Sequence, residues 1–424
     1  MVGLSIDWQL VRLPNGLRLI TIARPFTPTV AVRLFARAGS RYDAEQSLAD
    51  AQHLPLGLAH ITEHLILKGT RSRSQSEFFA AVERLGGVLE AGTTKEYVAL
   101  CAITPRNGLA TAVRVLAEIV TAPALRDEDF WSEKLVLLEE IQRSHDRESV
   151  IFDLFAEAIW RENPLRHPTQ GTLQGLYDLD HQAVLSFFGQ RYVAGNMLLV
   201  VCGDIEHLET RQLVSASFSS ILAGPDQPPE LSMESPFSET RRTHLLKDVN
   251  LTHLLIGVPT VGMKHEDRSA LKVIERVLGM GGSARLYQRL RAEAHLVYSV
   301  NTIAAHYEDA GYFAVRTACD PAHVSQVQQS ILQEWDRLRE KGVSDNEMVA
   351  AKSNYAGTLA RRFETNRSVA GVFGTEALLH RAESLEEAVE RIDAVQHSDV
   401  LRVARKYLNS QCHIAVTVGR QPDL

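Results

Sequence analysis

The sequence predicts an α+β protein with two homologous domains, each a mixed or antiparallel sheet covered by helices. Three observations lead to this prediction: a globular composition, a proline-rich stretch near the middle, and the same order of strand and helix patterns on both sides of it. With 45% hydrophobic and 23% charged residues, the composition excludes a disordered or fibrous chain. The length of 424 residues suggests two or three domains, each large enough to bury a core.

The proline-rich stretch, residues 223–236, reads AGPDQPPELSMESP and contains four prolines. Few of its side chains could pack in a core, and such a composition is typical of a linker. Because it divides the chain into nearly equal parts, we expect an N-terminal domain over residues 1–222 and a C-terminal domain over residues 237–424.

Both halves show the same series of elements. A strand pattern at 97–103 is followed by helix patterns at 110–120 and 132–143, and a strand pattern at 312–318 by helix patterns at 324–341 and from 349 onward. A proline follows each strand pattern, and Asp127 and Asp345 occupy matching places before the second helices. Any α/β chain offers strand–helix pairs in series, but the shared order, prolines and acidic helix starts favour an internal duplication.

The N-terminal part opens with strands. Residues 13–16, Leu-Pro-Asn-Gly, are a turn signal, and the segments 17–22 and 29–36 alternate with a period of two. This alternation predicts a hairpin of the two segments.

Charge and cysteine content limit the possible partners and location. The net charge is −7, with 52 acidic and 45 basic residues, so no basic excess points to nucleic acid or an anionic membrane. The four cysteines lack the close spacing of a metal or redox motif and are expected to be buried thiols in a reducing compartment. No signal peptide is visible at the N-terminus, and the apolar runs are too short to span a bilayer, which predicts a cytoplasmic protein.

A candidate metal site lies in the segment Gly57–Thr70, whose apolar spacing is helical. His60 and His64 stand at i and i+4, so both imidazoles project from one face, as two ligands of a tetrahedral Zn²⁺ must. Glu63 lies beside them, where a carboxylate can act as general base on a metal-bound water. The alternative is a solvated helix face; the apolar residues of the segment argue for a packed helix.

A third ligand is expected from the helix pattern that contains Glu133 and Glu140. These carboxylates are seven residues apart and share a face, so one can bind the metal while the other orients a ligating histidine. Glu139 faces away and is expected to be solvated. On periodicity alone, any of these acids could instead be ordinary helix surface. The chain contains 16 histidines, but beyond His60 and His64 none has ligand-like spacing.

The HxxEH helix, the Lys-Gly-Thr that follows it and an ExxxxxxE pattern about seventy residues later resemble the inverted-motif zinc peptidases. That family includes pitrilysin, insulysin and the mitochondrial processing peptidases, and the length suits its shorter, two-domain bacterial-type branch. The resemblance implies that His60, His64 and Glu140 bind one Zn²⁺ per chain. It also implies that Glu63 is the base and that Glu133 supports the site.

A second signature lies in the C-terminal half, where Gly282–Arg291 is followed by Tyr298. In the family, an Arg and a Tyr seven residues apart reach the bound peptide near the scissile carbonyl, and Arg291 and Tyr298 match that spacing. A cation and a phenol suit this role because they can bind substrate carbonyls and a developing oxyanion. The alternative reading is a salt-bridged Arg and a half-buried Tyr.

The chain departs from the family pattern in two places. The family usually has Asn-Ala-x-Thr on the strand whose edge pairs with the extended substrate, whereas this chain has Glu90, Ala91 and Thr93 at those positions. We expect these residues to bind substrate and Glu90 to favour basic peptides. The loop 43–56 before the zinc helix is longer than usual; its His53 is not expected to be a ligand, because the helix already supplies two.

The resemblance therefore implies a zinc-dependent endopeptidase that acts on peptides or unfolded precursor segments. Family members enclose substrates in a clam-like chamber and assemble in pairs, which implies a homodimer or a heterodimer with a homologous subunit. The alternative is a non-catalytic or partner-dependent subunit of a heteromeric processing complex. Because this chain keeps both signatures, we expect it to be catalytic.

Overall fold

The computed structural model describes residues 6–45, 54–144, 149–229 and 237–420. It consists of two compact units: unit 1 comprises Met1–His145, His167–Glu230 and Arg361–Leu385, and unit 2 comprises Asp146–Arg166, Leu231–Ala360 and Glu386–Leu424. These units differ from the expected domains 1–222 and 237–424, because residues 146–166 and 361–385 each belong to the unit of the other half. Of the expected linker, residues 230–236 lie outside the described residues.

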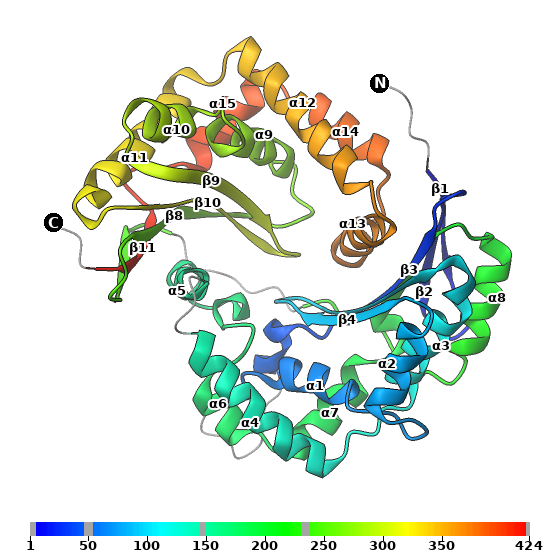
Figure 1. The fold of residues 1–424 in the computed structure, drawn as a ribbon. Coiled ribbons are helices and arrows are strands. Elements are labelled where there is room, and N and C mark those ends of the chain that lie inside the picture. Colours follow the sequence, from blue (N-terminus) through cyan, green and yellow to red (C-terminus); the bar gives the residue numbers. More distant parts are fainter. Residues whose placement is uncertain (1–5, 46–53, 145–148, 230–236, 421–424) are drawn as a thin grey trace. The chain divides into compact units, whose positions relative to one another are not determined.

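Unit 1 is built on a six-stranded sheet of order β1-β2-β6-β3-β5-β4 (Figure 1). The strands are β1 (Asp7–Arg12), β2 (Arg18–Ala23), β3 (Thr29–Ala36), β4 (Val88–Thr93), β5 (Val98–Pro105) and β6 (Met197–Gly203). All neighbours are antiparallel except β2 and β6, which are parallel. β4 is therefore an edge strand, which lies beside the helix expected to hold the metal.

The expected hairpin of segments 17–22 and 29–36 is wrong. β2 and β3 are not paired, because β6 lies between them, parallel to β2 and antiparallel to β3. The turn at residues 13–16 instead joins β1 to β2, where Arg12 pairs with Arg18. β6 is buried at every position, so it can occupy the centre of the sheet, and a period of two in β2 and β3 carries no information about which strand pairs with which.

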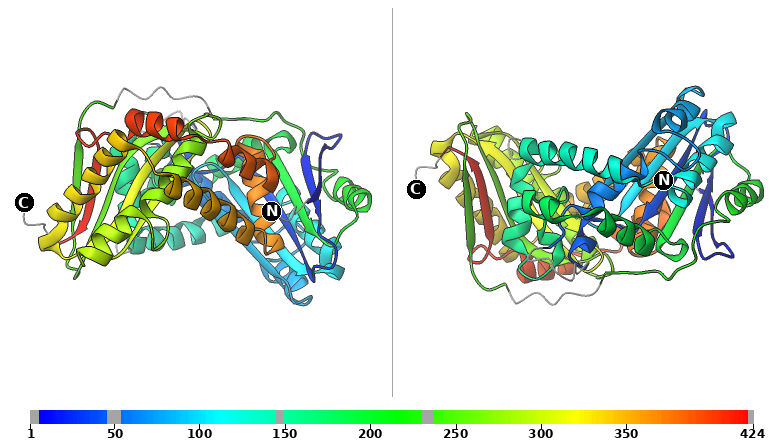
Figure 2. Two further views of the ribbon diagram at one scale, coloured as in Figure 1. Left: turned by 90° about the horizontal axis from the view of Figure 1, so that it is seen from above. Right: turned by 90° about the horizontal axis from the view of Figure 1, so that it is seen from below.

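Most helices of unit 1 cover one face of this sheet. They are α1 (Leu58–Ile66), α2 (Gln75–Glu83), α3 (Leu109–Thr121), α4 (Asp127–Ser144), α6 (Leu173–Asp178), α7 (His181–Arg191) and α8 (His207–Ser217). Alternate residues of the strands, among them Val32, Leu34 and Leu100, join Ile61 of α1 and Leu116 of α3 in one core. The opposite face of the sheet contacts α13 (Asn366–Leu379), drawn in orange in Figures 1 and 2.

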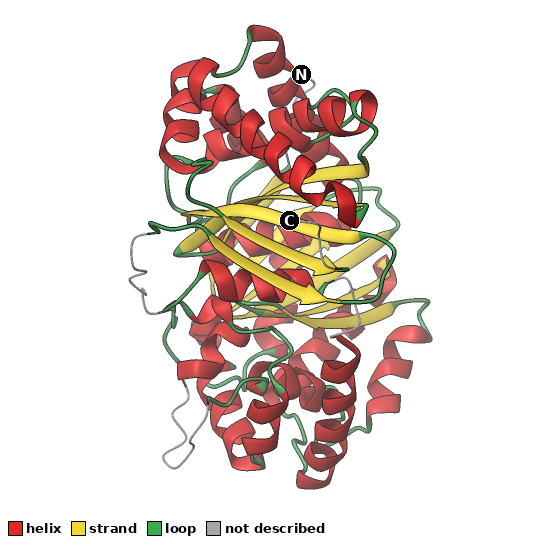
Figure 3. Ribbon diagram, turned by 90° about the vertical axis from the view of Figure 1, so that its left-hand side faces the viewer, coloured by secondary structure: helices red, strands yellow, loops and turns green. Residues whose placement is uncertain are grey.

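Unit 2 is built on a five-stranded sheet of order β7-β11-β8-β10-β9; both sheets are yellow in Figure 3. The strands are β7 (Arg241–Leu246), β8 (Thr252–Val261), β9 (Val297–His306), β10 (Ala310–Cys319) and β11 (Ile414–Gly419). The helices are α5 (Val150–Ile159), α9 (Arg268–Gly279), α10 (Arg285–Tyr287), η5 (Gln288–Glu293), α11 (Val324–Lys341), α12 (Asp345–Arg362), α14 (Leu385–Asp393) and α15 (His397–Tyr407). The last residues of α12 and the first of α14 belong to unit 1.

The two sheets have the same topology. The order β2-β6-β3-β5-β4 corresponds to β7-β11-β8-β10-β9, with one parallel pair in each, β2 with β6 and β7 with β11. Corresponding details agree: Arg24 N–H donates to the carbonyl of Gly203, as Lys247 N–H does to Gly419, and both glycines have φ near 150°. The predicted fold class, two homologous α+β domains, is confirmed.

Each sheet receives one helix from the other half of the sequence, α13 on the first sheet and α5 on the second. Each of these helices contacts its sheet through a phenylalanine ring packed on a glycine. In unit 1 the phenylalanine is Phe35 of the sheet and the glycine is Gly374 of the helix; in unit 2 the glycine is Gly257 of the sheet and the phenylalanine is Phe155 of the helix. A Cβ on Gly374 would lie 2.0 Å from the Phe35 ring, and one on Gly257 would lie 2.6 Å from the Phe155 ring. In each unit, a glycine thus makes room for a phenylalanine where the helix from the other half of the sequence packs on the sheet.

We expect Gly374→Ala to lower the free energy of unfolding by about 1–3 kcal/mol, because the added methyl cannot fit without moving α13 or Phe35. The measurement is the shift of the urea midpoint of the full chain. The matched control is Gly189→Ala on α7, where a Cβ meets nothing within 4 Å and the higher helix propensity of alanine should leave stability unchanged or raised. Equal stability of the two variants would contradict this account.

Two further expectations can be compared with the structure. All four cysteines are buried with free thiols, as the sequence predicts. Within the described ranges, no helix has both the length and the apolar character that crossing a bilayer requires.

Candidate metal centre

The helix α1 begins at a buried carboxylate that sequence reasoning missed. Asp43 accepts hydrogen bonds from the backbone N–H groups of Gly57 and Ala59, both at 2.8 Å, which satisfies donors at the start of the helix. Burial raises the pKa of Asp43 to about 7, against these hydrogen bonds, which lower it. Because Gly57 has φ 106°, the chain can turn sharply into α1 there. Asp43 thereby helps to fix the start of the helix that carries both histidines.

The helix α4 packs beside α1. Its residues Phe130, Leu137 and Ile141 are buried in the same core as α1, and the ammonium of Lys134 donates to the carbonyls of Tyr177 and Leu179 at 3.1 and 2.7 Å. With these residues in the core, the side of α4 that carries Glu133 and Glu140 faces the histidines of α1.

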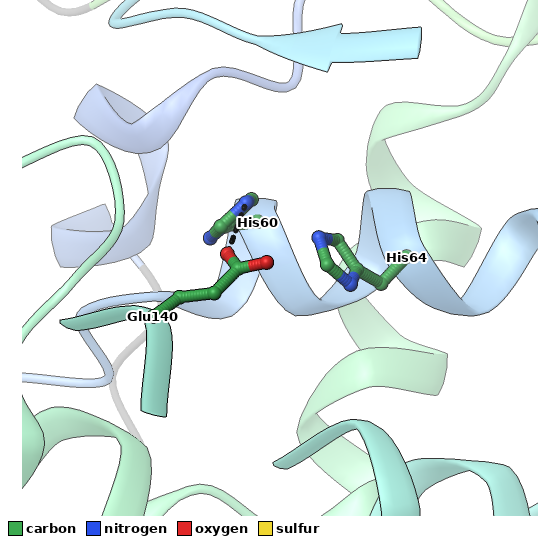
Figure 4. A group of neighbouring side chains, drawn as sticks. All are labelled: His60, His64 and Glu140. Atoms are coloured by element: carbon green, nitrogen blue, oxygen red, sulfur yellow. Dashed lines mark ion pairs between the residues drawn. The ribbon is translucent and has the colours of Figure 1, made fainter. Parts of the chain in front are cut away.

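The structure brings His60, His64 and Glu140 together, with one potential ligand atom from each and all of them within 4.8 Å of one another (Figure 4). His60 Nε2 lies 3.9 Å from a carboxylate oxygen of Glu140. Ligand atoms around a tetrahedral zinc are roughly 3.3 Å apart, so small side-chain rotations would close the group on one ion. Two imidazoles and a carboxylate are a donor set of catalytic zinc sites. The residues present therefore fit Zn²⁺.

The electrostatics of the histidines also suit metal binding. Burial, together with the charge of the neighbouring His64, lowers the pKa of His60 to about 4. His60 is therefore neutral near pH 7, which is the form of histidine that can bind a metal ion.

Glu133 orients His64. Its Oε2 lies 2.8 Å from His64 Nδ1, and its Oε1 lies 2.5 Å from the Nζ of Lys68. Burial alone would raise the pKa of Glu133, but the hydrogen bonds from Lys68 and His64 outweigh it and hold the pKa below its usual range. An ionised Glu133 accepts the Nδ1 proton of His64, which leaves Nε2 as the free donor atom. Sequence reasoning missed Lys68, since nothing local pairs it with Glu133.

Glu63 is buried beside the three candidate ligands and accepts a hydrogen bond of 3.1 Å from the hydroxyl of Thr93 on β4. Burial raises the pKa of Glu63; the nearby charge of Glu140 raises it further, whereas His64 and the Thr93 hydroxyl oppose the shift. A carboxylate with a raised pKa is a stronger proton acceptor, as a general base requires. The exposed Glu139, in contrast, pairs with Arg143 on the surface of α4, as expected of a solvated residue.

The edge strand β4 carries the other residues expected to meet substrate. Thr93 faces the metal centre, whereas the side chain of Glu90 forms an ion pair with Arg367 of α13. Sequence reasoning missed this partner, because Arg367 lies far away in the chain. The ion pair balances the charge of Glu90 and so reduces the basis for a preference for basic peptides. Ala91 lies between them on the strand and is partly exposed.

Arg291 and Tyr298 lie together in unit 2. The Arg291 guanidinium is 4.7 Å from the centre of the Tyr298 ring and 5.1 Å from that of Tyr287, and Arg291 stands on a π-helical turn, η5. Tyr298 is 80% exposed, so it is not the half-buried tyrosine of the alternative reading. Cation–π contacts on both rings hold the guanidinium in place.

The described residues of unit 2 form no counterpart of the metal group. α9 follows β8 as α1 follows β3, and it carries Lys272, Glu275 and Arg276 at the spacing of His60, Glu63 and His64. Glu275 Oε2 is 2.6 Å from Arg276 and 3.4 Å from Lys272, and Oε1 accepts from the N–H of Ala304 at 2.8 Å. Among the described residues, His60, His64 and Glu140 are the only group that could hold a metal ion.

In comparisons with known proteins, the two halves of the sequence match two different family models. Residues 18–173 match the family model described as insulinase (peptidase family M16), and residues 178–355 match the model described as the peptidase M16 inactive domain. An uncharacterized zinc protease of Mycobacterium leprae is 31% identical over 95% of this chain and 90% of its own length. One of Streptomyces coelicolor is 28% identical over 97% of this chain and 87% of its own length.

Solved structures show the same fold. A protease from Helicobacter pylori superposes with a TM-score of 0.89 at 22% identity, covering 98% of this chain and 100% of that one. A peptidase M16 inactive domain from Pseudomonas fluorescens gives 0.87 at 17% identity, covering 98% and 99%. With two family models that together span most of the sequence and relatives named as zinc proteases along nearly its whole length, the chain belongs to peptidase family M16.

Proposed function

We propose that this protein is a zinc-dependent endopeptidase that hydrolyses peptides or unfolded precursor segments. The observation that carries the proposal is the group of His60, His64 and Glu140, with ligand atoms within 4.8 Å, beside the buried carboxylate of Glu63. We propose one Zn²⁺ per chain, because unit 2 has ion-paired Lys, Glu and Arg where unit 1 has its histidines.

When bound, zinc supplies Lewis acidity, which lowers the pKa of a bound water and polarises a carbonyl. Residues of the chain would transfer the proton and position the groups of the site. Glu63 accepts a proton from the attacking water and later delivers it to the leaving amine. Thr93 holds the Glu63 carboxylate through its 3.1 Å hydrogen bond, and Glu133 holds the tautomer of His64.

The extended substrate is proposed to add to the free edge of β4, where Glu90, Ala91 and Thr93 would contact it. An edge strand offers unpaired backbone groups that can bind a peptide through main-chain hydrogen bonds, whatever its sequence. Arg291 and Tyr298 are proposed to bind substrate carbonyls from unit 2. The exposure of Tyr298 and its stacking on Arg291 support this role.

The assembly and location are proposed from the family resemblance. We propose a homodimer, or a heterodimer with a homologous subunit, in the cytoplasm. A quenched fluorescent peptide tests the function: purified protein should cleave it, a chelator should abolish cleavage and Zn²⁺ should restore it. Fewer than about half a zinc per chain with Zn²⁺ available would contradict the proposal. Inactivity that a co-purified homologous subunit relieves would identify a partner-dependent subunit instead.

We expect Glu133→Gln to weaken zinc binding about 10- to 100-fold, because an amide accepts the His64 Nδ1 proton less well than a carboxylate and loses the ion pair with Lys68. Competition with a chromophoric chelator measures this affinity. The control is Glu128→Gln, at the exposed start of the same helix, for which no change is expected. Unchanged affinity of Glu133→Gln would mean that Glu133 does not support the site.

A further inference from the structure

A pocket of about 350 Å³ lies in unit 1 between α13 and the sheet, on the face opposite α1. Its polar lining consists of Arg33, Tyr97, Arg362, Ser368, Thr375 and Glu376. None of these residues belongs to the metal centre or to the edge of β4. The pocket is thus a separate feature of the unit that carries the candidate metal centre.

Arg33 occupies an unusual place for an arginine. It lies on β3 near the centre of the sheet, directly opposite Cys101 on β5, which in turn lies opposite Glu90 on β4. Its Nε is buried without a hydrogen-bond partner, and the described parts of the chain provide no ion pair for it. The guanidinium lies 5.0 Å from the centre of the Phe35 ring, as a cation–π pair.

The backbone of α13 makes room for this guanidinium. A Cβ on Gly371 would lie 2.7 Å from Nη1 of Arg33, so any side chain at that position would displace the charged group. Glycine lowers the stability of a helix interior by about 1 kcal/mol relative to alanine. A glycine at this position therefore keeps the arginine head at the pocket wall.

The charge of the pocket is positive. Arg362 adds a second guanidinium, and it too has no ion pair with any residue that the structure describes. Glu376 is the only acid in the wall, and the nearby Glu90 is engaged by Arg367. Arg33 is partly buried, whereas Arg362 is exposed. A guanidinium that is partly removed from water favours an anionic partner, and the planar donors of both groups match carboxylate and phosphate oxygens.

Neutral donors complete the site. The Tyr97 hydroxyl lies 3.3 Å from the Thr375 hydroxyl, and Ser368 adds another in the same wall. We propose that this pocket binds an oxyanion group, a carboxylate or a phosphate, between the guanidinium groups of Arg33 and Arg362. This site is distinct from the proposed peptidase centre and does not depend on bound zinc.

Isothermal titration calorimetry on the full chain at constant ionic strength tests the proposal. The probes are inorganic phosphate and an N-acetylated dipeptide with a free C-terminal carboxylate, with its C-terminal amide for comparison. We expect saturable binding of phosphate or of the free acid, and binding about 10- to 100-fold weaker in Arg33→Met and Arg362→Gln. The matched control is Arg114→Gln, an exposed arginine on α3, which should bind as the wild type does.

Further arms separate this site from the metal centre and identify the ligand. If the anion binds in the pocket, His60→Ala should keep the wild-type anion affinity. If the anion instead binds at the metal, its binding would be lost in His60→Ala and retained in Arg362→Gln. Tighter binding of phosphate would identify a phosphorylated ligand, and tighter binding of the free acid a peptide terminus. If Arg33→Met does not fold, Arg362→Gln and Gly371→Ala carry the test. Absence of saturable binding by either anion, or wild-type affinity in the pocket variants, would overturn the proposal.

Discussion

Replacement of Glu63 by glutamine is expected to lower kcat/KM for a quenched fluorescent peptide by about 10²- to 10⁴-fold, the usual contribution of a general base. Glutamine keeps the shape of the side chain and an oxygen that can accept the hydrogen bond from Thr93. It cannot accept a proton from water. Since Glu63 is not one of the three residues whose ligand atoms cluster, the zinc content should stay unchanged.

Two comparisons make this test specific. Thr93→Val removes the hydroxyl that holds the Glu63 carboxylate, so a smaller loss of activity is expected with zinc again retained. Glu139→Gln alters a solvated carboxylate of α4 and should be fully active. Activity that persists in Glu63→Gln would exclude the proposed base, and loss of zinc in that variant would mean that Glu63 binds the metal.

Local periodicity predicts the helices well, because a helix is defined by contacts a few residues apart. α11 spans Val324–Lys341, the range that its pattern predicts. The helix expected from residue 132 begins at Asp127, since its first turn is acidic and precedes the apolar residues that the pattern detects. His60, Glu63 and His64 were predictable for the same reason: their spacing within one helix brings them together.

Partners that are distant in the chain could not be predicted. The hairpin of β2 and β3 is wrong because β6, more than 160 residues further on, pairs with both. The apolar faces of α5 and α13 indicate burial, but nothing in either helix indicates that it packs on the sheet of the other half. Lys68, Asp43 and Arg367 were missed because their partners are defined only by the folded chain.

The duplication gives both units a corresponding helix, but among the described residues only that of unit 1 contributes to a possible metal group. Both units present a helix after the corresponding strand, with charged or ionisable residues at i, i+3 and i+4. In α9, Lys272 and Arg276 neutralise Glu275 within a buried ion-pair group, so no donor atom is left for a cation. The same backbone can therefore support a metal centre or an internally neutralised charge group, and the choice depends on whether imidazoles or cationic side chains flank the glutamate.

If Glu140 is the third zinc ligand, Glu140→Gln should lower the zinc affinity more than Glu133→Gln does. Glu140→Gln should weaken zinc binding by more than about 100-fold, because a carboxylate next to His60 is lost from the donor set itself, whereas Glu133→Gln only alters the support of His64. Activity should fall with zinc occupancy and recover partly when excess Zn²⁺ is added. The adjacent Glu139→Gln is the matched control, since this carboxylate is exposed and pairs only with Arg143 in the described structure. The opposite order, with Glu133→Gln the more damaging variant, would exchange the roles of the two carboxylates. That outcome would leave the pair of histidines and the proposed peptidase chemistry intact, because Glu133 and Glu140 lie on the same face of α4 and both reach the histidines of α1.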